Sequence, residues 1–177
     1  SVVDILSHYA RLKAWIPFYT KTKDSLTGQN SSQFYRRKRT GRFNVKVAEN
    51  LYIKKSYKDS IYKYIREVDQ REREGYKYSD LGYYLFKEVL EEKYDKPLNI
   101  LAENSFYKPL GANRMTYLPL QKFHKSVIVP TEKDDYYRNQ LIHGYVHDMG
   151  AAMLGGVAGH AGLFANANDV AKIMQMY

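Results

Sequence analysis

The sequence contains no cysteine among its 177 residues. This absence excludes a disulfide framework, a thiolate metal site and a cysteine nucleophile. It leaves the cellular compartment open, because a cysteine-free chain is stable in oxidising and reducing environments alike. No apolar run approaches the ~18 residues that a membrane-spanning helix needs, and no positively charged segment followed by an apolar one opens the chain. We therefore expect neither a membrane span nor a secretion signal within these residues.

The composition is that of a globular protein. Hydrophobic residues make up 44% of the chain, charged residues 27% and aromatic residues 15%, and so high an aromatic content is foreign to disordered tails. The length suits one domain. The chain has no internal repeat and no low-complexity tract.

Positive charge is concentrated in one part of the chain. The formal net charge is +9, and residues 21–75 contain 15 Lys and Arg against 7 Asp and Glu. The densest cluster is 36–39 (RRKR) with Arg42, and tyrosines at 35, 52, 57, 62 and 64 lie nearby. Interleaved basic and aromatic residues are typical of a nucleic-acid surface, but also of a solvated basic face. Because no zinc, RNA-binding or recognition-helix pattern accompanies them, we expect no nucleic-acid partner.

Hydrophobic periodicity and capping residues predict a mostly helical chain. Ser1 with Asp4, and Ser56 with Asp59, have the spacing of capping boxes. The predicted helices are 2–8, 57–72, one that follows Ser79 and Asp80 with Leu81, Leu85 and Val89 on one stripe, a short one from Pro97 to about 109–111, and a last one capped by Asn168.

Short strands and loops fill the remainder of the prediction. Alternating apolar residues predict strands at 42–47 and 51–54, and a β-rich tripeptide predicts a third at 127–129. Residues 9–35 and 130–150 are expected to be loops, and 155–165 a tight glycine-rich segment. The last helix has Val170, Ile173, Met174 and Tyr177 on one face, and this apolar stripe continues to the last residue without a cap. We therefore expect residues 1–177 to be an internal part of one domain.

The first group of residues that suggests chemistry is Tyr78-Ser79-Asp80. It precedes a predicted helix, whose positive dipole end would favour an anion. A phenol with an ordinary pKa of ~10 needs such help to act as a base near neutral pH. On spacing alone, a tyrosine packed before a capped helix explains the pattern equally well.

Four segments, in order, resemble serine beta-lactamase-related hydrolases: class C beta-lactamases, low-molecular-weight penicillin-binding proteins and related esterases. Residues 75–92 (GYKYSDLGYYLFKEVLEE) resemble the second-motif region of that family, and 3–8 (VDILSH) its "DLLSH" element. Residues 96–98 (KPL) with 106–113 (FYKPLGAN), and 155–172 (GGVAGHAGLFANANDVAK), resemble two later segments. The amino-acid sequence of 147–164 is most similar to that of envelope serine hydrolases of Bacteroidetes-type bacteria. Some of these are fused to a beta-N-acetylglucosaminidase domain.

The resemblance implies a Ser-x-x-Lys nucleophile, a Tyr-x-Asn motif and a late Lys/His-x-Gly motif. In this family the serine forms an acyl-enzyme, the lysine and tyrosine manage its proton, and a backbone oxyanion hole stabilises the developing charge. Only the second motif falls within this chain, so Tyr78 takes the acid/base role and Asp80 orients the substrate. Asp80 departs from the family's asparagine, because a carboxylate only accepts hydrogen bonds whereas an amide also donates. An ester or another amide is therefore at least as suitable a substrate as a beta-lactam or a peptide.

Two serines in the chain fit the pattern Ser-x-x-Lys. A chain of this composition is expected to contain about one such match by chance. Ser60 lies inside a predicted helix, and Ser105 follows Tyr78, which is the wrong order for the family. By resemblance, the nucleophile lies before residue 1 and the third motif beyond Tyr177. We therefore expect these 177 residues by themselves not to turn over substrate. His160-Ala161-Gly162 imitates the third motif, but its neighbours match the family's earlier Gly-Leu-Phe segment.

The histidines give no strong metal pattern. His143 and His147 are four residues apart, which suits zinc only on a helix, and Gly144 lies between them with no glutamate following. We interpret them as structural, and expect His147 and Asp148 to brace the glycine-rich segment. His8 and His124 carry no pattern. No metal and no organic cofactor is implied.

The sequence therefore predicts an α+β fold of the beta-lactamase/transpeptidase type, of which this chain is a mostly α-helical part with a few short strands. The parent domain is expected to be a serine hydrolase that acts on a small-molecule or cell-wall-derived acyl substrate in the periplasm or cell envelope, with a fused glycosidase domain allowed by the resemblance. Two alternatives remain: a non-catalytic envelope-binding module on the same scaffold, and a basic nucleic-acid-binding domain.

Overall fold

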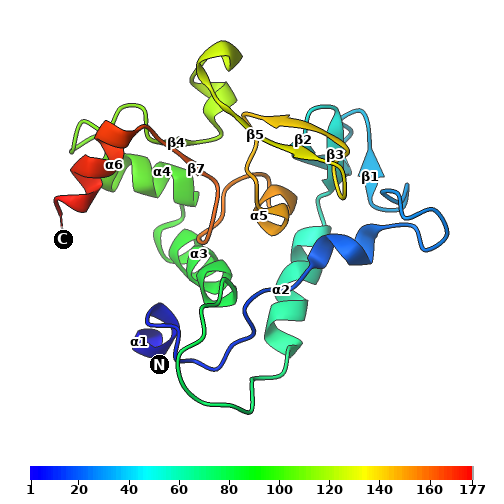
Figure 1. Ribbon diagram of the computed structural model, residues 1–177, viewed down its shortest axis with the longest axis horizontal. Coiled ribbons are helices and arrows are strands. Elements are labelled where there is room, and N and C mark those ends of the chain that lie inside the picture. The colour runs from blue at the N-terminus through cyan, green and yellow to red at the C-terminus, as the bar shows by residue number, and fades with distance from the viewer. Residues whose placement is uncertain (177) are drawn as a thin grey trace.

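The computed structural model describes residues 1–176, and Tyr177 lies outside the described residues. Short strands and helices are mixed along the chain (Figure 1). The elements are α1 (Val2–Leu6), β1 (Tyr35–Arg36), β2 (Phe43–Ala48), β3 (Leu51–Lys54), α2 (Tyr57–Glu67), α3 (Leu81–Tyr94), α4 (Leu98–Ala102), β4 (Thr116–Tyr117), β5 (Pro130–Asp134), β6 (Gln140–His143), α5 (Met149–Met153), β7 (Leu163–Phe164) and α6 (Ala167–Met174).

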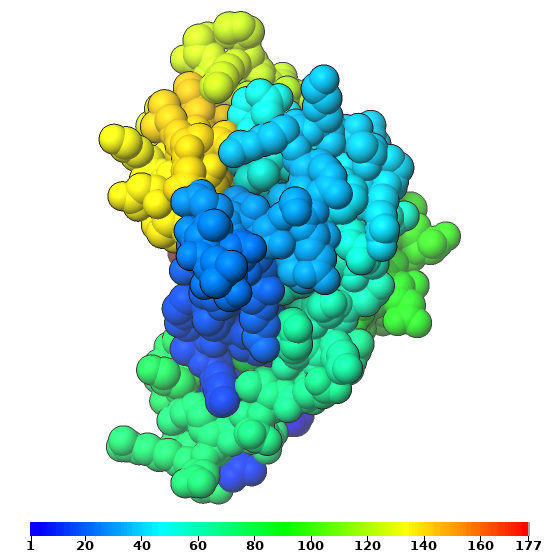
Figure 2. Space-filling view, turned by 90° about the vertical axis from the view of Figure 1, so that its right-hand side faces the viewer, coloured from blue at the N-terminus to red at the C-terminus, as the bar shows by residue number. Residues whose placement is uncertain are grey.

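The strands form three small antiparallel sheets. β1, β3 and β2 form a three-stranded sheet in that order, while β4 pairs with β7 and β5 with β6. The mixture of helices with few short strands confirms the α+β class. Among residues 1–176, no helix combines the length and the apolar character that crossing a bilayer requires. The N-terminal part of the chain, coloured blue to cyan, covers much of one face of the molecule (Figure 2).

The hydrophobic core lies where α5 meets the β2–β3 hairpin and the helices α2 and α3. α5 occupies the middle of the molecule, between the three-stranded sheet and α3 (Figure 1). Its Ala151 and Ala152 are buried, as are Ile53 of β3, Ile61 of α2 and Leu81 of α3. The small side chains of α5 allow the backbones around it to approach closely. The core thereby fixes the start of α3, which is preceded by the Tyr-x-Asp motif.

Several helix boundaries differ from the sequence prediction. α2 ends at Glu67 rather than at residue 72, because 69–75 (DQREREG) offers no apolar residue to bury. Ser56 makes no capping hydrogen bond with its side chain, whereas the Ser1–Asp4 capping box is formed. Asn166 rather than Asn168 caps α6, by accepting a hydrogen bond from the backbone of Asp169.

Two predicted apolar stripes are not buried as expected. On α3, Leu81 is buried as predicted, but Leu85 is only half-buried and Val89 is 56% exposed, while Tyr84 beside the stripe is buried. On α6, Val170 and Met174 are 44% and 63% exposed, and Tyr177 lies outside the described residues. Helical spacing alone therefore did not identify which face of these helices packs against the core.

The predicted strand at 127–129 is wrong. Residues 125–127 form a single 3-10 turn, Val127 and Val129 are exposed, and the strand begins only at Pro130. The segment 130–150, predicted to be loop, contains the β5–β6 hairpin and α5. The hairpin escaped prediction because charged side chains, rather than alternating apolar ones, hold it in place.

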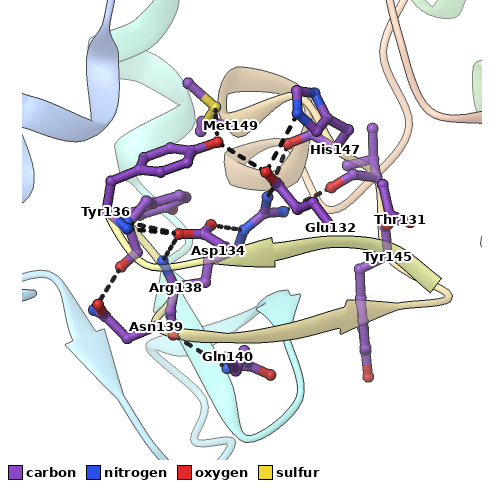
Figure 3. Close-up of polar contacts among 12 residues, drawn as sticks. Thr131, Glu132, Asp134, Tyr136, Arg138, Asn139, Gln140, Tyr145, His147 and Met149 are labelled. Atoms are coloured by element: carbon purple, nitrogen blue, oxygen red, sulfur yellow. Dashed lines mark hydrogen bonds and ion pairs between the residues drawn. The ribbon is translucent and has the colours of Figure 1, made fainter.

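A buried ion-pair network joins the hairpin to the start of α5 (Figure 3). The Arg138 guanidinium is fully buried and lies 2.7 Å from Asp134 Oδ2 and 2.6 Å from Glu132 Oε1. It also donates to the carbonyl oxygens of Val146 (2.6 Å) and His147 (2.8 Å). A buried charge is tolerated only when it is paired and hydrogen-bonded in this way. The network therefore fixes the backbone immediately before Asp148.

We expect Asp134→Ala to lower the free energy of unfolding by about 3–5 kcal/mol, the usual cost of leaving one member of a buried ion pair without its partner. Urea unfolding followed by circular dichroism measures this effect. Asp135→Ala is the matched control, because Asp135 is adjacent and exposed, and it should change stability by less than about 0.5 kcal/mol. Equal effects of the two substitutions would contradict a stabilising role for the network.

Candidate active site

Tyr78 and Asp80 lie in the extended segment that leads into α3. Asp80 is the residue before the helix, and its backbone N–H bonds the Ala14 carbonyl at 2.9 Å. Its side chain makes no capping hydrogen bond; Ser79 Oγ instead accepts from the Leu81 N–H at 3.2 Å. Because Ser79 does the capping, the Asp80 carboxylate is left available for other contacts.

The Tyr78 ring is 53% exposed and is not sealed in the interior. It lies 4.5 Å from the His8 ring, centroid to centroid, and the Asp80 carboxylate is close enough to its hydroxyl to influence its pKa. Partial burial and then the negative charge of Asp80 raise the pKa of Tyr78. The expected lowering by the helix dipole is therefore outweighed, and the phenol is protonated at neutral pH.

His8 is a neighbour of Tyr78 that sequence reasoning missed. Its Nδ1 accepts a hydrogen bond from the Ser79 N–H at 3.2 Å, so it holds the middle residue of the motif. The chain turns at His8 with a positive φ of 64° after α1 ends at Leu6, two residues earlier than predicted. The only signal for this role was its place in the VDILSH segment, which has no chemical pattern of its own.

Asp80 faces a second carboxylate, that of Asp148. Burial, together with the negative charge of Asp148, raises the pKa of Asp80, while the charge of His160 and the hydrogen bond from Tyr78 oppose this rise. The ionisable side chains of Asp80, Asp148 and His160 come from distant parts of the chain and influence one another's charge at the start of α3. No local pattern of residues indicated that Asp148 and Asp80 would lie together.

Asp148 and His160 connect α5 with the glycine-rich segment. His160 Nε2 lies 2.8 Å from Asp148 Oδ1, which also accepts from the Ala151 N–H at 2.6 Å. The His160 ring stacks on Tyr84 of α3 at 4.1 Å. Burial alone would raise the pKa of Asp148, but the hydrogen bond and charge of His160 lower it overall. The prediction that Asp148 braces the glycine-rich segment is confirmed.

The glycines of this segment allow it to contact α3 directly. A Cβ on Gly159 would lie 2.2 Å from the Tyr83 carbonyl oxygen and 3.0 Å from the Tyr83 carbonyl carbon. These distances are too short for any side chain, so the backbone itself packs against the first turn of α3. This confirms that these glycines serve the backbone.

Two hollows flank these residues. A cavity of about 10 Å³ lies among Asp80, Tyr84, Asp148 and the segment 15–19, which is close to the minimum for a single water. A larger cavity of about 310 Å³ lies between β2 and the segments 118–121, 144–146 and 155–156. Neither Tyr78 nor Asp80 lines the larger one. The described residues therefore provide one side of a candidate site around Tyr78, with no substrate-sized cavity beside it.

Neither Ser-x-x-Lys match forms a nucleophile pair among residues 1–176. Ser60 lies on α2, and Lys63 is 3.8 Å from Glu67. Ser105 lies in the helical turn 103–107, and Lys108 contacts Glu103 at 3.5 Å and Asn104 at 3.1 Å. Each lysine therefore contacts an acidic or amide side chain rather than its serine.

The remaining histidines have structural contacts. His143 lies on β6 rather than on a helix, with Nε2 2.6 Å from the Ile128 carbonyl oxygen, so it forms no one-turn pair with His147. His147 is exposed and lies 3.3 Å from Glu132, so it does not brace the glycine-rich segment as expected. The described residues contain no group of three or more potential metal ligands.

A family model described as "Beta-lactamase" matches residues 2–176. The chain belongs to the beta-lactamase family. It is similar to an N-acetylmuramyl-L-alanine amidase of Bacillus subtilis, with 31% identity over 189 aligned residues that cover 99% of this chain and 37% of that protein. It is also similar to a putative D-alanyl-D-alanine carboxypeptidase of Escherichia coli, with 39% identity over 110 residues that cover 55% of this chain and 25% of that protein.

This chain thus spans only 37% and 25% of the length of these two curated relatives. No solved structure matches it.

Asp148→Asn tests the charge of the Asp148–His160 pair, because asparagine is as good a helix cap as aspartate. The lowered pKa means that the folded state favours the carboxylate, so its contribution is full above the ordinary value of 3.8 and is lost as the pH falls through the lower folded value. We expect a loss of about 1.5 kcal/mol at pH 7 that becomes smaller as the pH falls below 3.8, measured by urea unfolding at pH 7 and at a pH below 3.8.

Asp135→Asn is the control for this substitution, because Asp135 is exposed and should show no such pH dependence. A loss for Asp148→Asn that is equal at both pH values would contradict the role of its charge.

Proposed function

We propose that this chain contributes the Tyr78–Asp80 motif to a serine hydrolase that forms an acyl-enzyme on an ester or amide. The observation that supports this role is the exposed phenol of Tyr78, which lies two residues before α3 and whose pKa is raised by partial burial and by the negative charge of Asp80. Residues 75–92 resemble the second-motif region of the beta-lactamase family, to which the chain belongs. The nucleophilic serine and its lysine would come from outside these 177 residues.

In this mechanism Tyr78 handles the proton of the leaving group. The serine oxygen attacks the carbonyl carbon as its own proton moves to the lysine, and a tetrahedral intermediate forms. The intermediate collapses when the carbonyl–heteroatom bond breaks, and the leaving nitrogen or oxygen takes the hydroxyl proton of Tyr78. The raised pKa of Tyr78 suits this acid role, because the proton is in place before the reaction begins.

Asp80 sets the direction of the Tyr78 hydroxyl. As a carboxylate it can only accept hydrogen bonds, so it holds the phenol O–H but cannot donate to a substrate carbonyl. This favours substrates that need no donor at this position, such as an ester or an amide bound mainly by the rest of the cleft. A beta-lactam, whose carbonyl and amide groups need a donor and an acceptor together, is the poorer fit.

The cell wall is the proposed source of the substrate, because the printed names of two relatives describe an N-acetylmuramyl-L-alanine amidase and a putative D-alanyl-D-alanine carboxypeptidase. We accordingly place the parent protein in the periplasm or cell envelope. A fused glycosidase domain would provide a second activity on the same polymer.

Tyr78→Phe in the longer protein that contains this chain and its nucleophile should lower kcat by about 10²–10⁴-fold, the usual contribution of a general acid. Hydrolysis of a p-nitrophenyl ester and of a muramoyl peptide, each followed with and without the substitution, measures this loss. Tyr76→Phe is the matched control, because Tyr76 is a neighbouring tyrosine that is 61% exposed, and it should leave kcat unchanged.

Unchanged turnover in Tyr78→Phe would overturn the acid role. If the unsubstituted protein bound cell-wall peptide but never hydrolysed it, the non-catalytic envelope module would be the correct interpretation. Turnover by the 177-residue chain alone, abolished by changing Ser60 or Ser105, would overturn the external nucleophile.

Asp80→Asn should move the substrate preference toward beta-lactams and peptides. It replaces an acceptor by a group that also donates, and one added hydrogen bond is worth about tenfold in the ratio of kcat/KM for a chromogenic beta-lactam to kcat/KM for an ester. Asp95→Asn, at the exposed far end of α3, is the control and should leave the ratio unchanged. A ratio that stays constant or falls in Asp80→Asn would contradict the orienting role.

A further inference from the structure

Five cations project from the turn between β1 and β2, which we call the basic turn: Arg36, Arg37, Lys38, Arg39 and Arg42. All five are exposed. Among residues 1–176, none of them forms an ion pair with a carboxylate, although many other lysines and arginines do. Their charge is therefore uncompensated locally and is available to an anionic partner.

A second turn displays an isolated apolar side chain next to the basic turn. Leu26 is 94% exposed. Asp24 Oδ1 accepts from the backbone N–H groups of Leu26 (3.1 Å) and Thr27 (2.9 Å), and Lys23 pairs with Asn30 across the base of the turn. The turn is therefore ordered by its own hydrogen bonds, and Leu26 contributes nothing to the core.

The two turns lie on one face of the molecule. Gln29, Asn30 and Ser32 line the same hollow of about 340 Å³ as Arg36 and Arg37. Both segments, in blue and light blue, lie on the side of the molecule that carries β1 in Figure 1, and they face the viewer in Figure 2. The turn that carries the exposed Leu26 and the basic turn are therefore neighbours on the surface.

We propose that the basic turn and Leu26 form a docking surface for an anionic phospholipid bilayer. Lysine and arginine side chains near such a surface are attracted by its negative potential. An apolar side chain at the edge of the patch adds binding by entering the boundary between headgroups and acyl chains. The interaction is peripheral, and it does not depend on the chemistry proposed for Tyr78.

The surroundings of the basic turn favour lipid over nucleic acid. Binding of single-stranded nucleic acid relies on exposed aromatic rings on which bases stack. Tyr35 and Phe43, which flank the basic turn, are 4% and 7% exposed, and the Arg36 guanidinium lies 4.3 Å over the Phe43 ring. Tyr57 and Tyr62 are also buried. The tyrosines that are interleaved with the charges in the sequence are thus mostly part of the core.

The test uses sedimentation of the 177-residue chain with vesicles of phosphatidylcholine alone and with vesicles in which phosphatidylglycerol replaces part of it. We expect binding only to the anionic vesicles, and weaker binding at high salt. The triple substitution of Arg37, Lys38 and Arg39 by Gln should weaken it by about 100-fold. Arg36 is left unchanged, because it contacts the Ser32 and Tyr35 carbonyls.

Two matched controls separate the surface from charge and hydrophobicity in general. Substitution of Lys93, Lys96 and Lys125 by Gln removes the same charge from exposed positions elsewhere and should have little effect. Leu26→Ser should weaken the binding that remains at high salt, whereas Val129→Ser, at a residue that is 81% exposed, should not.

Three results would overturn the proposal. They are equal binding to neutral and anionic vesicles, equal losses in the two triple variants, and tighter binding to single-stranded DNA than to anionic vesicles, with the same dependence on the basic turn. An effect of the basic turn without any effect of Leu26→Ser would overturn the insertion of Leu26.

Discussion

The guanidinium of Arg138 is a positive charge in the dry interior, and much of the structure around the candidate site depends on how it is satisfied. It makes four hydrogen bonds, to two carboxylates of β5 and to two backbone carbonyls just before α5. The hairpin and the start of α5 are thereby held together. Asp148 is the next residue along, so its direction toward His160 and α3 follows from the same constraint.

A second consequence is electrostatic. Asp148, fixed in this way, places a negative charge near Asp80, and Asp80 in turn lies against the hydroxyl of Tyr78. Each carboxylate makes the loss of a proton from its neighbour harder. The phenol is therefore a proton donor as it stands here, and only a cation brought from elsewhere would turn it into a base. A nucleophile motif that contains a lysine provides such a cation.

Local patterns predicted those parts of the chain whose interactions are themselves local. The Ser1–Asp4 capping box, the β2–β3 hairpin and the start of α3 were all confirmed. Predictions were wrong where distant residues decide the outcome. The β5–β6 hairpin is held by Arg138, and the exposed valines at 127 and 129 form no strand despite their propensity. Asp148 was predicted to brace the glycine-rich segment, but its position close to Asp80 was not predicted.

The amino-acid sequence by itself indicated the family and suggested the motif at Tyr78 and Asp80, because four short segments in a fixed order carry that information without reference to space. It also determined the Asp80 departure from asparagine, which is a matter of functional groups. The tertiary structure decided which charges meet. The coupling of Tyr78, Asp80, Asp148 and His160, and the exposure of the basic turn, arise from contacts across many residues of chain, and Coulomb interactions depend on distance in space rather than on separation in sequence.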